Sequence, residues 1–184
     1  MAIREETVNR TGSIVVGLIF TLAVTTVLVH KILNPSEQIE KIAFWDEPPA
    51  IRVCSSSPVK ISEVADAASW WRELGYEFDL IYGTDCAEII RYSTITIVLG
   101  QAELIQNNLL GRTTFYSNDE SNEMYWAIIE LAMPLERRVL EHELGHALGW
   151  MHVKEPGHMM HPKHYQGGWA FDGLIGSNEN VVIY

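Results

Sequence analysis

The residues of this 184-residue chain best suited to chemistry are its histidines, six of which lie between residues 142 and 164. Neutral imidazole is the commonest metal-ligating side chain in proteins. His142 and His146 are four residues apart, so on a helix their rings project from the same face and can hold one ion. The spacing therefore predicts a metal site.

The residues around this pair complete a longer pattern, H-E-x-x-H-x-x-G-x-x-H, which runs from His142 to His152. Glu143 points to the side of the ion where a water molecule would lie. Gly149 can adopt a positive φ, which lets the chain leave the helix sharply and return His152 as a third nitrogen ligand. Three protein ligands leave one position open for water, which is typical of a catalytic zinc site. H-E-x-x-H alone often arises by chance, whereas the extended pattern rarely does.

The sequence HELGHALGWMH resembles the motif of the metzincin zinc peptidases. It looks most like the matrixin branch, which comprises the matrix metalloproteinases and their microbial relatives. Metzincins also have a methionine turn beneath the zinc, and Met160 and Pro162 match the Met-x-Pro pattern of matrixins. Ordinary core packing is the alternative interpretation of Met160.

The resemblance implies a zinc-dependent endopeptidase that acts on protein or peptide substrates. One catalytic Zn²⁺, held by His142, His146 and His152, would lower the pKa of its bound water and polarise the scissile carbonyl. Glu143 would serve as the general base and then pass the proton to the leaving amine. The alternative function is a catalytically idle zinc-binding or adhesive domain on a membrane stalk, and the intact Glu143 argues against it.

The same resemblance makes four further residues candidates for substrate binding. In the metzincin fold, the fourth strand lies at a sheet edge, antiparallel to the bound peptide, and residues 111–116 map to that strand. Thr113 and Thr114 are the candidates on this strand. Pro162 and Tyr165 are expected to line the pocket for the side chain just after the cleaved bond.

The chain also departs from the matrixin pattern. Val153 follows the third histidine where matrixins usually have Ser, and Cys54 does not lie in a zinc-blocking propeptide motif. The loop 101–123 has no histidine, so the second, structural zinc of many matrixins is not expected. Four residues of this loop could bind Ca²⁺, although a solvated polar loop is the favoured interpretation: Asn118, Asp119, Glu120 and Asn122. The histidines left over are expected to be exposed loop residues around the cleft: His158, His161 and His164.

Apolar patterning predicts an α+β fold for the peptidase domain, residues 50–184. Five strands are expected, at residues 50–54, 76–82, 94–99, 112–116 and 124–131. Two main helices are expected, at residues 61–74 and 134–148, and the second carries the metal motif. This order implies a five-stranded mixed sheet backed by two helices, and the resemblance implies the twisted sheet of a metzincin-like zincin fold.

The two cysteines are too few for a disulfide scaffold or a four-cysteine zinc module. Cys54 ends the first expected strand and Cys86 follows the second. If these strands are parallel neighbours, both cysteines lie at the same end of the sheet, and a disulfide between them is geometrically reasonable. Two free thiols are the alternative.

Residues 1–33 are expected to form a short tail and a transmembrane signal anchor, because residues 13–29 are an uncharged run, SIVVGLIFTLAVTTVLV. No small-x-small cleavage site follows the run, which favours a retained single-pass anchor over secretion after signal cleavage. A buried helix is a further alternative, and the absence of a polar face argues against it. Residues 34–49 read as a polar stalk, and the peptidase domain is expected to be extracytoplasmic.

The charge balance excludes one class of partner. The chain has 13 Lys+Arg and 24 Asp+Glu, a net charge of −11, which argues against binding to nucleic acid. Its 47% of hydrophobic residues argues against intrinsic disorder. An acidic domain would be repelled by anionic lipid, which suits a domain that projects away from the membrane.

Overall fold

The computed structural model describes residues 39–176 of the chain. The expected membrane segment at 13–29 lies outside the described residues, as do residues 34–38 of the expected stalk and residues 177–184. Among residues 39–176, no helix is both long and apolar enough to cross a bilayer.

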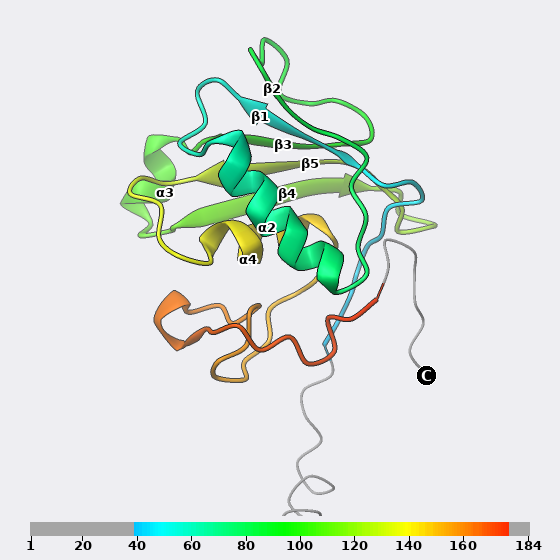
Figure 1. Ribbon diagram of the computed structural model, residues 1–184, viewed down its shortest axis with the longest axis vertical. Helices are drawn as coiled ribbons and strands as arrows, with labels where there is room; N and C mark the ends of the chain where they lie inside the picture. The colour runs from blue at the N-terminus through cyan, green and yellow to red at the C-terminus, as the bar shows by residue number, and fades with distance from the viewer. Residues whose placement is uncertain (1–38, 177–184) are drawn as a thin grey trace, which may run out of the picture. The chain divides into compact units, whose positions relative to one another are not determined.

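The described part is an α+β domain built on one five-stranded mixed sheet (Figure 1). Its strands are β1 (Ala50–Cys54), β2 (Ile81–Thr84), β3 (Thr94–Leu99), β4 (Gly111–Ser117) and β5 (Met124–Leu131). They lie in the order β2-β1-β3-β5-β4. All neighbouring pairs are parallel except β4 and β5, which are antiparallel. The mixed sheet is confirmed, and β4 lies at its edge as expected.

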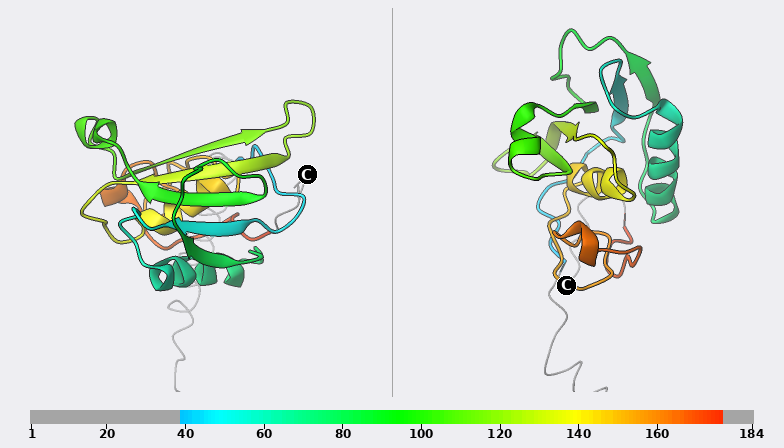
Figure 2. Two further views of the ribbon diagram at one scale, coloured as in Figure 1. Left: turned by 90° about the horizontal axis from the view of Figure 1, so that it is seen from above. Right: turned by 90° about the vertical axis from the view of Figure 1, so that its left-hand side faces the viewer.

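Three helices accompany the sheet: α2 (Ile61–Glu73), α3 (Ala102–Gln106) and α4 (Val139–Ala147). Figure 2 shows α2 and α4 on the same face of the sheet. Helix α2 buries Val64, Ala68 and Trp71 at the spacing of one helical face, which gives it an apolar side toward the sheet. A short 3₁₀ turn follows later in the chain (His164–Gln166).

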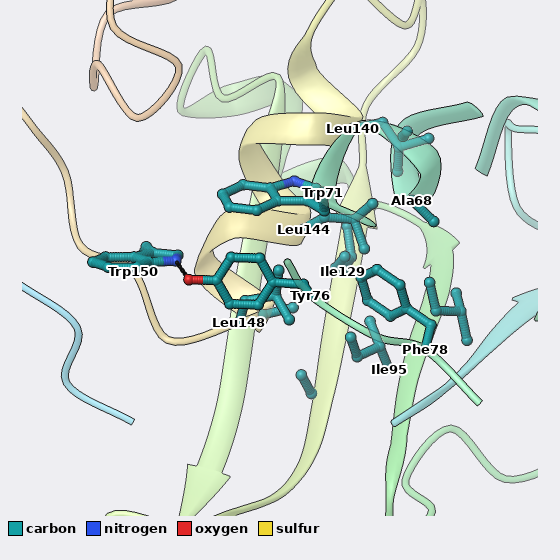
Figure 3. Close-up of a cluster of buried hydrophobic side chains, with 14 of the residues drawn as sticks. Ala68, Trp71, Tyr76, Phe78, Ile95, Ile129, Leu140, Leu144, Leu148 and Trp150 are labelled. Carbon is teal, nitrogen blue, oxygen red and sulfur yellow. Dashed lines mark hydrogen bonds between the residues drawn. The ribbon is translucent and has the colours of Figure 1, made fainter. Parts of the chain in front are cut away.

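The core lies between the sheet and these two helices. Figure 3 shows Trp71 and Tyr76 beside Leu144 and Leu148 of the chain around α4. The rings of Trp71 and Tyr76 meet edge to face at 5.4 Å, an arrangement that aromatic pairs favour. The Trp150 indole N–H donates to the Tyr76 hydroxyl at 3.0 Å, so the polar end of each buried aromatic has a partner.

Four expected elements have different bounds. Two differ only slightly: α2 ends at Glu73, one residue early, and β4 runs from Gly111 to Ser117, one residue longer at each end than expected. The other two differ more. The strand expected at residues 76–82 begins only at Ile81. Tyr76 and Phe78 are buried and alternate with exposed neighbours, but they pack into the core from the turn after α2 and join no strand. Helix α4 begins at Val139 instead of Pro134, because Arg138 adopts a left-handed backbone with φ of 72°. Helix α3 was not expected.

The domain also begins earlier than the sequence indicated. Residues 39–49, which we expected to belong to the stalk, pack into the domain. Ala43 and Trp45 are buried, and the Trp45 indole N–H donates to the carbonyl of Ala147 at the end of α4 at 2.8 Å. The proline pair and the acidic residues nearby gave this segment the composition of a linker. Its apolar side chains nevertheless cover the end of α4.

The two cysteines form a disulfide. Cys54 ends β1, Cys86 follows β2, and their Cα atoms are 5.3 Å apart. Strands β1 and β2 are parallel neighbours, which is the arrangement that the expected pairing requires. The disulfide thus ties β1 to the segment after β2, on the side of the sheet remote from the β4 edge.

Candidate metal centre

The three predicted ligands converge on one point. Helix α4 presents His142 and His146 from successive turns, and Gly149, with φ of 95°, ends the helix so that the chain turns back to His152. The Nε2 atoms of the three rings lie 3.0–3.3 Å from one another. Within residues 39–176, no other group of three or more His, Cys, Asp or Glu side chains is arranged to hold a metal.

These distances fit a shared metal ion. A four-coordinate ion with metal–nitrogen distances of about 2.0–2.1 Å, as for Zn²⁺, holds its ligand nitrogens about 3.3–3.4 Å apart. The observed triangle is within a few tenths of an ångström of that value. Three protein nitrogens leave a fourth position open, so the donor set is suited to an ion that also binds water or substrate.

Hydrogen bonds fix the orientation of two of the rings. The Nδ1–H of His142 donates to the carbonyl of Met159 at 2.8 Å, and that of His146 donates to the carbonyl of Trp150 at 2.7 Å. Because a carbonyl only accepts, each Nδ1 carries the hydrogen and each Nε2 presents a lone pair. The site is therefore set up for metal binding through Nε2.

Burial also keeps the rings neutral. It lowers the pKa of His142 to about 3, with the neighbouring His146 ring adding to the effect, and it lowers the pKa of His146 to about 4. Burial, followed by the charge of His161, lowers the pKa of His152 as well. Neutral imidazole is the form that binds a metal, so the site needs little proton release at neutral pH.

Glu143 lies one residue along α4 from the first ligand and is only 6% exposed. Its Oε2 accepts a hydrogen bond from the Thr113 hydroxyl at 2.7 Å. Burial raises the pKa of Glu143 to about 7, and the Thr113 hydrogen bond opposes that rise. A carboxyl with such a pKa can both take up and release a proton near neutral pH.

Gly111 makes room for this carboxylate, which the sequence reasoning did not foresee. A Cβ at Gly111 would lie 2.6 Å from Oε1 and 2.8 Å from Cδ of Glu143. The requirement for glycine follows from the contact between β4 and α4, and nothing in the sequence of residues 111–114 indicates that Gly111 lies against Glu143.

Met160 forms part of the floor beneath α4. It is fully buried, and a Cβ at Gly145 would collide with its Sδ, so the helix and the methionine approach closely. The Met160 backbone N–H donates to Nδ1 of His158 at 3.0 Å, and His158 Nε2 lies 3.2 Å from the carbonyl of Asp172. His158 is thus a buried structural residue.

The expectation that the three remaining histidines are exposed is wrong, because two are buried and the third is partly buried. His158 is fully buried and His161 is 6% exposed. His164 is partly buried, between the carboxylate of Glu136 at 3.1 Å and the carbonyl of Arg137 at 2.6 Å. These residues shape the turns around the cleft through hydrogen bonds, which a sequence pattern does not disclose.

A cleft of about 780 Å³ opens beside the three ligands. Apolar and polar side chains line it, among them Leu110, Phe115, Val139 and three of the substrate-binding candidates: Thr113, Pro162 and Tyr165. Thr114, the fourth candidate, lines a separate hollow of about 360 Å³. Successive residues of a strand point to opposite faces, so the Thr114 side chain lies on the far side of the sheet from the cleft.

The polar loop at residues 118–122, for which Ca²⁺ binding was the less favoured interpretation, uses the Asn118 side chain to form its own turn. Asn118 Oδ1 accepts hydrogen bonds from the backbone N–H groups of Glu120 and Ser121 at 2.8 and 3.3 Å. Its Nδ2 donates to the Tyr125 hydroxyl at 2.9 Å. Asn118 thus acts as a turn-forming residue.

A scan against protein-family models finds none that matches this chain, and a search of curated proteins finds no match.

Proposed function

We propose that this chain is a zinc-dependent endopeptidase of the metzincin type, similar to the matrixins. One observation carries the proposal: three neutral imidazoles meet at 3.0–3.3 Å beside a buried carboxylate, at the wall of a cleft. The motif alone supports a metal site. The position of Glu143 next to that site, on the cleft side, adds the base that peptide hydrolysis needs.

The ligands in this proposal are His142, His146 and His152, which fit Zn²⁺ in number, kind and spacing. Bound zinc supplies Lewis acidity, which activates water and polarises the carbonyl of the scissile bond. Glu143 accepts the proton of the attacking water and delivers it to the amine nitrogen that leaves.

The edge strand β4 is the proposed binding strand for the peptide. It forms one wall of the cleft, and within residues 39–176 it pairs with β5 alone, so its other edge can add an extended peptide through backbone hydrogen bonds. Val139, Pro162 and Tyr165 also line the cleft, and a substrate side chain next to the cleaved bond would insert among them. These walls favour an apolar side chain.

The metzincin assignment is supported by the order of elements around the site. An antiparallel edge strand precedes the metal helix, a glycine ends that helix, and a buried methionine lies beneath it. We also propose that residues 13–29 anchor the protein in a membrane and that the peptidase domain is extracytoplasmic. The Cys54–Cys86 disulfide supports this location, since such bonds persist in oxidising compartments.

Zinc-dependent cleavage of a peptide library by the full chain, purified in mild detergent, tests the proposal. The protein stripped with chelator should be inactive, and added zinc should restore cleavage. Glu143→Gln should bind zinc with unchanged stoichiometry and lose at least about 100-fold in kcat, the scale of general base catalysis. Glu73→Gln, which alters an exposed carboxylate on α2, is the matched control and should retain wild-type activity.

Two outcomes would contradict the proposal. Peptidase activity retained in Glu143→Gln would remove Glu143 from the mechanism. A zinc-loaded wild-type protein that cleaves no peptide would instead favour the catalytically idle zinc-binding domain.

A further inference from the structure

The Glu143 carboxylate is enclosed by two residues of β4. Its Oε2 lies 2.7 Å from the Thr113 hydroxyl, and its Oε1 lies against the backbone of Gly111, where a Cβ would come within 2.6 Å. Thr113 is the only side chain within residues 39–176 that forms a hydrogen bond with this carboxylate. A buried carboxylate with one donor depends on that donor for its orientation.

Thr113 is itself held firmly in place. Its backbone pairs with Ile129 of β5, and its Oγ1 also lies 3.0 Å from the main-chain carbonyl of Glu143. The hydroxyl has one hydrogen, and an ionised carboxylate is a stronger acceptor than a carbonyl. The hydrogen is therefore donated to Oε2 when Glu143 is ionised, and the carbonyl is a second anchor for the hydroxyl.

The placement of Thr113 on β4 links two parts of the site. Gly111, Thr113 and Phe115 alternate along the strand and all line the cleft. The strand that we propose to align the peptide thus also holds the carboxylate.

We propose that Thr113 is a positioning residue for Glu143, in place of the direct substrate contact that its location on the edge strand suggested. Thr113 holds Oε2 and thereby fixes the orientation of the carboxylate that exchanges the proton during peptide hydrolysis. This inference rests on the proposed peptidase function. No element of the H-E-x-x-H pattern specifies it, because the contact joins residues 30 positions apart.

Three substitutions at residue 113 separate the hydroxyl from the shape of the side chain. Thr113→Val keeps the shape and removes the hydroxyl, Thr113→Ser keeps the hydroxyl, and Thr113→Ala removes both the hydroxyl and a methyl group. Thr96→Val is the matched control. Thr96 lies in β3 of the same sheet, its buried Oγ1 has no hydrogen-bond partner, and its side chain does not line the cleft.

In steady-state assays of the zinc-loaded full chain, Thr113→Val and Thr113→Ala should lose about 10- to 100-fold in kcat, as is typical when a supporting hydrogen bond is removed. KM should stay within about twofold, because a positioning residue acts on the transition state and not on substrate binding. Thr113→Ser and Thr96→Val should both keep near-wild-type kcat. Zinc content should be the same in all variants.

A crystal structure gives a readout apart from activity. In metal-free Thr113→Val, the Glu143 carboxylate should leave its place beside Gly111, whereas in Thr113→Ser it should remain. The inference is overturned if Thr113→Val keeps wild-type kcat, if only KM changes, or if Thr113→Ser is as impaired as Thr113→Val. Wild-type and Glu143→Gln proteins assayed in parallel test the peptidase function separately, so failure of that function is distinguishable.

Discussion

Two kinds of titratable side chain meet at the metal centre, and burial shifts their pKa values in opposite directions. It lowers the pKa of His142 to about 3 and that of His146 to about 4, and it raises the pKa of Glu143 to about 7. Both shifts favour the neutral form of the side chain. Without metal, His142 and His146 are thus neutral at neutral pH, while Glu143 is divided between its neutral and ionised forms.

These shifts determine how the stability of the metal-free protein depends on pH. Below pH 6.5, His142 and His146 bind protons in the unfolded chain but not in the folded one. Their contribution to the free energy of unfolding is therefore present above that pH and is lost as the pH falls. Glu143 acts in the opposite sense. Its contribution to the free energy of unfolding is present below pH 4.5 and is lost as the pH rises through 7, because the folded state then buries an ionised carboxylate.

Glu143→Gln should therefore stabilise the chelator-treated protein at pH 8 more than at pH 4.5. The difference in the free energy of unfolding between variant and wild type should grow by on the order of 3 kcal/mol across that range, because burial raises the pKa of Glu143 from 4.5 to about 7. Urea denaturation at several pH values measures it. A difference that does not change with pH would mean that Glu143 has an ordinary pKa in the folded protein.

At the scale of secondary structure, the sequence predicts the elements whose patterns are local. The strands expected at residues 50–54, 94–99 and 124–131 have the bounds observed, since each is a short apolar or alternating run. The four-residue spacing of His142 and His146 is by itself enough to place both ligands on one helical face. In these cases the residues within the element are enough to predict its position and its exposed or buried faces.

What could not be predicted depends on contacts between distant segments. The first turn of α4 starts at Val139 because Arg138, in a left-handed conformation, donates hydrogen bonds to the carbonyls of His164 and Gly168. Residues 39–49 belong to the domain because Trp45 packs against the end of α4. The pairing of Thr113 with Glu143 depends in the same way on how β4 lies against α4, which the alternation of β4 alone does not reveal.

The end of α4 offers a prediction at this scale. Gly149 has φ of 95°, and a Cβ there would collide with the carbonyl of Ala43. Gly149→Ala should therefore displace the turn that returns His152 to the site, lowering both the melting temperature and the zinc affinity. Gly157→Ala is the matched control, because Gly157 also has a positive φ, of 86°, but has open space around its Cβ position.

Gly149→Ala should affect both stability and zinc affinity, whereas Gly157→Ala should affect stability alone. Gly157→Ala should cost about 1 kcal/mol in the free energy of unfolding from backbone strain alone, with zinc affinity unchanged. Gly149→Ala should cost more and weaken zinc binding at least about tenfold, the scale of losing support for one ligand. Thermal unfolding and competition with a zinc chelator measure both quantities. Equal zinc affinities in the two variants would show that the close packing against Ala43 does not position His152.

For the whole molecule, the disulfide and the apolar N-terminal run bear on the same question, which is the side of the proposed membrane anchor on which the domain lies. The cytosol keeps thiols reduced, whereas extracytoplasmic compartments let disulfides persist. The bond between Cys54 and Cys86 closes a separation of 32 residues and ties β1 to the segment after β2. A domain stabilised by a disulfide suits an oxidising compartment. The net charge of the chain, −11, suits a domain that projects away from an anionic membrane surface.

The last prediction concerns this location. Intact cells that express the full chain are treated with a membrane-impermeant maleimide, with or without prior exposure to an impermeant reductant. We expect no labelling without the reductant, because the two cysteines are bonded. After the reductant we expect labelling of Cys86, which is partly exposed, if the domain faces outward as proposed. The double variant Cys54→Ser, Cys86→Ser should never be labelled. Labelling that requires cell lysis, or free thiols in the untreated chain, would contradict the extracytoplasmic orientation and leave a cytosolic domain as the better interpretation.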